Sequence, residues 1–421
     1  MSLFSLFKRS SETVDSAHFK YQPAIELEHQ LSEQIYNALQ GPIVEEVLHK
    51  IANDSSDNWW RSNMEGNSLK VEADLLPDFY QLCQEVKQRL GYEGKVDFYI
   101  TADSTINAFS VATEGEDEPD IVNLNSELFN MMSTDELRFV VGHELGHLIN
   151  HDSALSRLIH FIFPAESTNA PVTLQYKIRL HDQLAELVAD RYGYIAAAGN
   201  LAACITAFYK MASGLDLAKL NVSIDALIAN NTKRLSYFLS DKGVSRSTHP
   251  VNPIRVEALN LYANAASQKQ LDEKMDELIS ILLKVGDGER DEYIARFIAS
   301  AGLIVANADG DITKEEIDTV IEELANVKIF PRKFLDEIAQ GEVGEIFQEA
   351  VGKLLNLDPS LRDGLMGFMI QIVMSDQNID EKEVKLLYDF GEMIGMNDKE
   401  VAQNIAASIQ HHFVPSLDAI C

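Results

Sequence analysis

The chain has 421 residues, which predicts two or three domains, and its 46% of apolar residues can form a sizeable core. The formal net charge of −31 argues against nucleic acid, and against an anionic membrane surface, as the main partner. Its three cysteines have neither metal-ligand nor disulfide spacing, and its apolar runs are too short or too interrupted to cross a bilayer. We therefore expect a soluble, cytoplasmic protein without a transmembrane segment.

The N-terminal part, residues 1–70, is predicted to be helical. Residues 1–9 place basic side chains after a very short apolar stretch, which is the reverse of a signal peptide. Apolar residues at helical spacing predict two helices over 23–51, separated at Gly41-Pro42, and another helix over 75–90. A flexible end is the favoured interpretation of the first residues, and the alternative is weak peripheral membrane contact through Leu3, Phe4, Leu6 and Phe7.

Three short segments predict a small β-sheet. Val96, Phe98 and Ile100 alternate with other residues, as in a half-buried strand, and residues 107–112 and 121–124 also have the composition of strands. The sheet is expected to precede the helix that carries the most informative motif of the chain.

That motif is H-E-x-x-H, at residues 143–147. In a helix, His143 and His147 lie one turn apart on one face, where two imidazoles can bind one Zn²⁺. Glu144 lies between them and can deprotonate a water molecule. Ser133 and Glu136 have the spacing of a capping box, which predicts where the helix begins. Ordinary histidines of a buried helix are the alternative interpretation.

A third ligand is expected downstream, because a catalytic zinc takes three protein ligands and keeps one open position. Glu186 is the candidate, and Asp190 lies one helical turn further on the same face, where it can orient a histidine. Acidic pairs at this spacing are common on solvated helices, so this pair is informative only because it follows H-E-x-x-H. The helix is expected to continue into an alanine-rich stretch, 195–206.

Four motifs follow one another along the chain: Asn107-Ala108-Phe109, Asp135-Glu136-Leu137 with the H-E-x-x-H helix, Glu186 to Asp190, and Thr248-His249-Pro250 with Arg255. With these motifs in this order, roughly residues 70–262 resemble the HtpX-like and CAAX-prenyl-protease-like zinc metallopeptidases, a branch of the gluzincins. The relatives often contain membrane helices, which are missing from this sequence.

The resemblance implies roles that spacing alone does not give. Asn107-Ala108-Phe109 would form an edge strand that binds the substrate backbone by strand addition. His249 would face the zinc, either to stabilise the tetrahedral oxyanion or to occupy the open position of the metal in a resting state. Arg255 would be a buried partner for an acidic group such as Asp190. One zinc ion per chain and a protein or peptide substrate are implied as well.

The C-terminal third has a different character, since residues 271–400 contain 30 acidic and 13 basic side chains. It contains a weak repeat: residues 307–317 recur as 374–384, and each copy opens a new helix with capping-box spacing. An EF-hand is excluded, because the first copy has glycine at the fourth position of the turn and not at the sixth.

Roughly residues 285–400 instead resemble the helical tellurite-resistance TerB-like domain. One interpretation is a module that binds a cation or a partner through its acidic turns at Asp309 and Asp376. The other is a pair of helix–turn–helix units whose turns only cap helices, and the sequence does not separate the two.

These observations predict an α+β fold: a mainly helical, gluzincin-type peptidase domain with a small β-sheet, followed by an all-helical domain. The expected parts are an N-terminal helical segment at 1–70, a zinc metallopeptidase domain at 71–265 and an acidic TerB-like domain at 271–421. The predicted function is a zinc endopeptidase acting on proteins, with protein quality control as one setting. The alternative is a non-catalytic or self-inhibited zinc-bound scaffold whose acidic domain binds an unknown partner.

Overall fold

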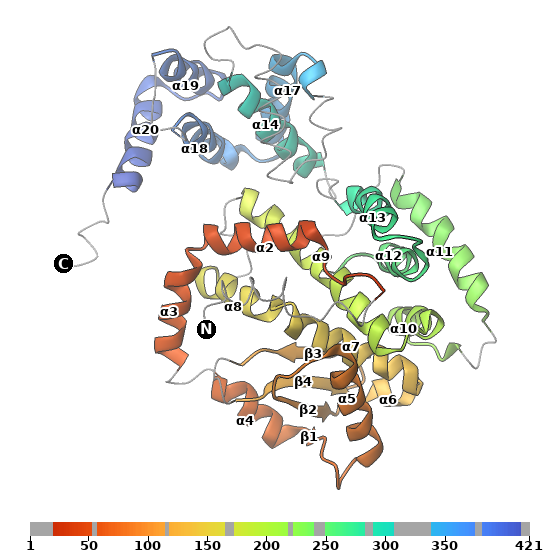
Figure 1. Ribbon diagram of the computed structural model, residues 1–421. Coiled ribbons are helices and arrows are strands. Elements are labelled where there is room, and N and C mark those ends of the chain that lie inside the picture. The colour runs from red at the N-terminus through yellow and green to blue at the C-terminus, as the bar shows by residue number, and fades with distance from the viewer. Residues whose placement is uncertain are drawn as a thin grey trace. The chain divides into compact units, whose positions relative to one another are not determined.

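The chain divides into two compact units, Met1–Leu282 and Leu283–Cys421. The first unit combines helices with a small sheet, and the described part of the second is helical, which confirms the predicted fold class (Figure 1). Within the described residues, no helix is both long and apolar enough to cross a membrane. The computed structural model describes residues 20–52, 57–113, 118–164, 172–217, 222–239, 249–282, 289–306, 338–374 and 381–413.

The helices of the first unit pack mainly on one another, and α4, α6 and α7 also contact the sheet. The predicted break at Gly41-Pro42 is present, because one helix ends at Ala38 and the next begins at Gly41. In chain order the helices are α2 (Glu26–Ala38), α3 (Gly41–Ala52), α4 (Asp57–Asn67), α5 (Pro77–Leu90), α6 (Glu127–Met131), α7 (Thr134–Ile149), α8 (Asp152–Ile162), α9 (Val172–Ala196), α10 (Leu201–Ser213), α11 (Ile224–Leu239), α12 (Asn252–Asn264) and α13 (Gln268–Leu282).

The sheet has four strands in the order β1-β2-β4-β3. Strands β2 and β4 are parallel, whereas β1 and β3 run antiparallel to their neighbours. Strand β4 is one of the two inner strands and is largely buried, and β3 at the edge packs against α7. The segment Asn107-Ala108-Phe109 therefore leads into an edge strand. The strands are β1 (Leu69–Lys70), β2 (Val96–Thr101), β3 (Ala108–Val111) and β4 (Asp120–Asn125).

Helix α7 begins at the predicted capping box. The backbone N–H of Ser133 donates to the Glu136 carboxylate at 2.6 Å, and the backbone N–H of Glu136 donates to Ser133 Oγ at 3.4 Å. The same carboxylate pairs with the buried Lys210 of α10 at 2.8 Å. Burial works against the charge on Glu136, but Lys210 and Thr206 hold the pKa of its carboxyl below its usual value. The start of the motif helix is thus fixed by a local cap and a long-range ion pair.

Helix α9 includes only the first two residues of the alanine-rich stretch 195–206, so the prediction that it continues along this stretch was wrong. The helix ends at Ala196, and the left-handed residues Ala198 and Gly199 (φ 55° and 77°) reverse the chain. Asn200 then caps α10, because its side-chain oxygen accepts from the backbone N–H of Ala203 at 3.1 Å. Glycine after a helix and asparagine before the next are strong boundary signals, and they outweigh the helix preference of the alanines.

Helix α13 lies in the first unit, where it packs against α12, although the sequence placed most of this segment in the acidic domain. Its side chains Leu271, Met275 and Ile279 are buried. We therefore propose that the acidic domain begins after Leu282 and not at residue 271.

In the second unit, aromatic side chains from three helices meet in the core. The rings of Phe297, Phe347 and Phe390 lie 5.5 to 6.2 Å apart, measured between centroids. The acidic turns at Asp309 and Asp376 fall outside the described residues, so cation binding there stays a prediction. The described elements are α14 (Glu289–Ala306), α17 (Val343–Leu357), the 3₁₀ turn η4 (Pro359–Leu361), α18 (Arg362–Val373), α19 (Glu381–Met393) and α20 (Asp398–Phe413).

Candidate metal centre

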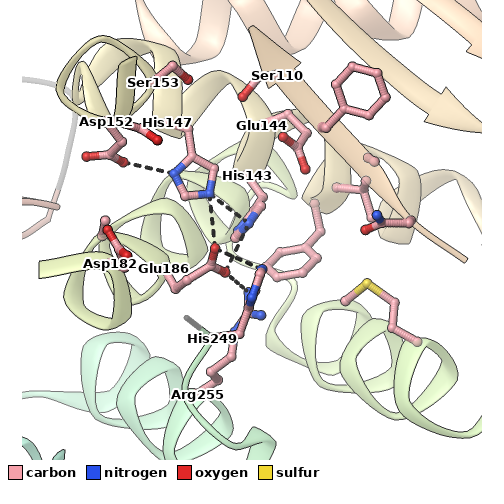
Figure 2. A pocket seen from close by; sticks show the side chains of 18 of the residues that line it. Ser110, His143, Glu144, His147, Asp152, Ser153, Asp182, Glu186, His249 and Arg255 are labelled. Atoms are coloured by element: carbon pink, nitrogen blue, oxygen red, sulfur yellow. Dashed lines mark hydrogen bonds and ion pairs between the residues drawn. The ribbon is translucent and has the colours of Figure 1, made fainter. Parts of the chain in front are cut away.

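Three side chains from α7 and α9 converge on one point (Figure 2). The Nε2 atoms of His143 and His147 are 3.2 Å apart, and each lies 3.5 Å from an oxygen of Glu186. Ligand atoms at the corners of a tetrahedron around zinc, with bonds of about 2.0–2.1 Å, are about 3.3–3.4 Å apart. Glu186 Oε2 is also buried without a well-formed hydrogen bond. The spacing and chemistry of these three groups therefore fit a zinc ion.

Glycines allow α7 and α9 to approach closely enough to form this arrangement. A Cβ atom on Gly142 would lie 2.2 Å from the Cβ of Ala196, and one on Gly146 would lie 2.9 Å from the Cβ of Tyr192. Both separations are too short for real contacts. Each glycine directly precedes one of the two histidines, His143 or His147. The residues that allow close helix packing therefore alternate with the candidate metal ligands. Two glycines inside a helix otherwise cost stability, which is the signal in the sequence that could have indicated this close packing.

A carboxylate lies beside the second nitrogen of each histidine. Asp152 Oδ2 is hydrogen-bonded to His147 Nδ1 at 2.8 Å, whereas Asp190 Oδ1 lies 3.0 Å from His143 Nδ1 without the geometry of a hydrogen bond. Such contacts fix the ring orientation and leave Nε2 directed at the metal position. The sequence predicts this role for Asp190 but not for Asp152. Its only sequence signal is its position five residues after His147, at the start of α8.

Arg255 of α12 joins the acidic groups of α9. Its Nη2 lies 2.6 Å from Asp190 Oδ1 and 3.2 Å from Glu186 Oε2, while its Nε donates to Asp190 Oδ2 at 2.8 Å. Burial works against ionisation of both carboxylates, but Arg255 lowers the pKa of each, and they remain charged. The ring of Phe208 lies beneath the guanidinium, at 4.9 Å from its centroid.

His249 and Glu144 approach the same region from opposite sides. His249 Nε2 lies 3.2 Å from Glu186 Oε1, a separation similar to those among the three ligand candidates, although 59% of its side chain is exposed. Figure 2 shows Glu144 on the side of Ser110, which belongs to β3. Both residues line the same cavity as His143 and Glu186.

That cavity has a volume of about 520 Å³ and runs from the ligand candidates to the edge strand. Asn107, Ala108, Phe109 and Ser110 line it on the β3 side. Trp60 of α4 packs on Phe109, with ring centroids 5.5 Å apart. The structure thus places the residues named for metal binding, proton transfer and substrate binding around one space.

His151 is not part of this cavity. It has a left-handed backbone (φ 61°) immediately before α8, and it lines a different cavity, of about 910 Å³, together with residues of α5 and α9. Burial lowers the pKa of its imidazole. His249, in contrast, lies beside Glu186 at the metal position.

Comparisons with known proteins agree with this architecture. Residues 78–263 match the model of peptidase family M48, and residues 295–405 match the model of tellurite resistance protein TerB. These matches confirm the resemblance drawn from the motifs: part of the first unit is similar to M48-type, HtpX-like peptidases, and part of the second is similar to TerB.

Individual relatives are distant. Plastoglobule-localized metallopeptidase 48 of Arabidopsis thaliana is 24% identical over 49% of this chain and 62% of its own length. A protease HtpX homolog of Streptococcus uberis is 30% identical over 21% of this chain and 29% of its own length. A protease HtpX homolog of Gemmatimonas aurantiaca is 27% identical over 46% of this chain and 78% of its own length. The matched part of this chain therefore spans less than two thirds of the first two relatives. No solved structure gives a significant match.

Proposed function

We propose that the chain is a zinc-dependent endopeptidase that cleaves protein substrates. The observation that carries the proposal is the convergence of His143, His147 and Glu186, with separations of 3.2 to 3.5 Å, in a cavity that an edge strand lines. The named relatives, a metallopeptidase and HtpX proteases, support the same reaction class.

In this proposal the three ligands would hold one zinc ion, which when bound supplies Lewis acidity to the scissile carbonyl and to a water molecule. Glu144 takes the proton of the attacking water and passes it to the leaving amine. Asp190 and Asp152 keep the two histidines in the orientation that binds metal, and Arg255 keeps Asp190 and Glu186 charged.

Strand β3 supplies the means of binding an extended peptide. An edge strand has unpaired backbone groups, to which a substrate can add as a further strand. Because Ala108 and Phe109 also line the cavity, a peptide on this edge lies beside the metal position. Recognition through backbone groups suits unfolded proteins, which supports the proposed setting in protein quality control. Cytoplasmic location remains a prediction.

The most direct test of this function is the substitution Glu144→Gln. The amide keeps the size of the side chain but accepts no proton, so we expect full zinc content and a loss of casein hydrolysis of roughly 10²–10⁴-fold. Glu127→Gln, on α6 and outside the residues that line the cavity, is the control and should keep both properties. Undiminished hydrolysis by Glu144→Gln would refute the assigned role.

A second candidate function, a self-inhibited zinc protein, follows from the position of His249. Its Nε2 lies as close to Glu186 as the other ligand candidates do, so we propose that it takes the fourth metal position in this state. Its large exposure indicates a contact that a substrate can displace. His249→Ala should then raise casein turnover roughly tenfold, the effect of a closing contact worth about 1.4 kcal/mol. A fall in turnover would favour an oxyanion role, and inert wild-type and variant proteins with full zinc would favour a scaffold.

A further inference from the structure

A second group of side chains of the kinds that bind metal ions lies beside His147. Glu28 of α2, Asp152 of α8 and His181 of α9 offer three ligand atoms that all lie within 4.8 Å of one another. His181 Nε2 is 3.0 Å from Glu28 Oε1 and 3.9 Å from Asp152 Oδ1. Two of these side chains, Glu28 and His181, are each only 2% exposed.

The nitrogen of His181 that faces the carboxylates has no hydrogen-bond partner. Although Nε2 is close to Glu28, the contact does not have the geometry of a hydrogen bond. Buried polar atoms without a partner are rare and costly. An imidazole nitrogen and a carboxylate oxygen that lie 3.0 Å apart without a hydrogen bond between them can both be directed at a common ion.

Neighbouring groups hold the two carboxylates in place. Ser32 Oγ donates to Glu28 Oε1 at 3.0 Å, and Asn150 Nδ2 donates to Asp152 Oδ1 at 2.8 Å. Such outer hydrogen bonds commonly support ligating carboxylates. Among the residues with described side chains, no lysine or arginine forms an ion pair with Glu28 or Asp152, so one buried and one partly buried carboxylate face one imidazole.

We propose that Glu28, Asp152 and His181 bind a second divalent transition-metal cation, of the Zn²⁺ class, in addition to the ion at His143, His147 and Glu186. One imidazole nitrogen and two carboxylate oxygens suit such a cation. Asp152 connects the two centres, because its other oxygen contacts His147 Nδ1. A proton on His181 competes with the metal ion for the imidazole nitrogen. Burial disfavours the protonated imidazole, but Asp182, Glu28 and Asp152 raise the pKa of His181 to about 10.

The test counts zinc in the full-length protein after equilibration with excess Zn²⁺ and removal of free metal. We expect two zinc ions per wild-type chain, one in His181→Gln and one in Glu186→Ala. Asp182→Asn is the matched control and should keep two, because its carboxylate contacts the opposite nitrogen of His181, Nδ1, at 3.4 Å. Glu28→Gln should also hold one, and it replaces His181→Gln if that variant does not fold.

One zinc per wild-type chain, unchanged in His181→Gln, would overturn the second site and leave a protonated His181 in its place. Two zinc ions in both proteins would overturn it as well, because the second ion would then lie elsewhere. The Glu186→Ala count separates this result from the proposed function, since a wild type with one zinc and a Glu186→Ala variant with none leaves the first centre intact.

Discussion

Glu136 combines two roles in one side chain, since it completes the cap of α7 and neutralises the buried Lys210. Glu136→Gln keeps the cap but leaves Lys210 without a counter-charge, so we expect it to lower the free energy of unfolding by about 3 kcal/mol at neutral pH. The pKa of Glu136 is lower in the folded chain than its ordinary 4.5, so its stabilisation is complete above that value and is lost as the pH falls through the folded pKa.

Urea unfolding of both proteins in a series of buffers measures this difference, which should shrink in acid. The control is Asp135→Asn, because this neighbouring carboxylate is 43% exposed and its pairing with Arg138 should be worth less than about 1 kcal/mol. Equal stability of wild type and Glu136→Gln at neutral pH would show that the buried pair contributes nothing.

Single residues also show how far the sequence could predict the site. The metal-type ligands and Glu144 follow from chemistry at helical spacing, and the family resemblance supplied His249 and Arg255. Asp152 and the group around His181 could not be found in this way. Their partners come from α2, α8 and α9, and the contacts depend on how these helices pack, which no spacing within one helix records.

At the scale of elements, the contact between α7 and α9 positions Glu186 opposite the histidines. Gly146→Ala should push the helices apart, because its Cβ would meet the backbone of Ala189 at 3.0 Å and the side chain of Tyr192 at 2.9 Å. We expect a stability loss of about 1–3 kcal/mol and weaker zinc binding, since Glu186 lies on the displaced helix. Thermal unfolding and zinc titration measure the two effects.

Gly66→Ala is the control for this change. A Cβ atom at this position of α4 would meet nothing within 4 Å, so the substitution should leave zinc binding unchanged and add up to about 1 kcal/mol through helix propensity. If Gly146→Ala behaved like Gly66→Ala, close approach of the two helices would not be needed for the site.

The elements themselves were predicted well where a local signal dominates. The capping box, the alternating strand and the break at Gly41-Pro42 all depend on residues within one or two turns. The end of α9 was not predicted, because the alanine content of residues 195–206 favours a helix. The boundary signal of Gly199 and Asn200 outweighs this preference. The strand order could not be derived, since the parallel pairing of β2 with β4 is a long-range choice.

At the scale of the whole molecule, the division after Leu282 predicts which fragments fold. A chain ending at Leu282 should fold and retain zinc, whereas one ending at Gln268 lacks α13 and its buried residues Leu271, Met275 and Ile279. Burial of each such side chain adds about 1.5–3 kcal/mol to the free energy of unfolding. The sum over the three is comparable with the whole free energy of unfolding of a typical domain, about 5–15 kcal/mol. Circular dichroism melting and zinc content compare the two.

The complementary fragment, residues 283–421, should be helical and free of zinc, because all the proposed ligands lie in the first unit. It also serves as the negative control for metal carried through purification. Equal melting temperatures of the two N-terminal fragments would place α13 outside the peptidase core and return the boundary to residues 265–271.

The position of Arg255 also has a consequence for how the protein is made. Synthesis runs from the N-terminus, so the histidines of α7 leave the ribosome before Glu186 and Asp190, and Arg255 follows Asp190 by 65 residues. Until it emerges, the carboxylates of α9 have no guanidinium beside them and are costly to bury. A nascent chain therefore completes the centre only when almost the whole peptidase domain has been translated, and a truncated translation product would lack it.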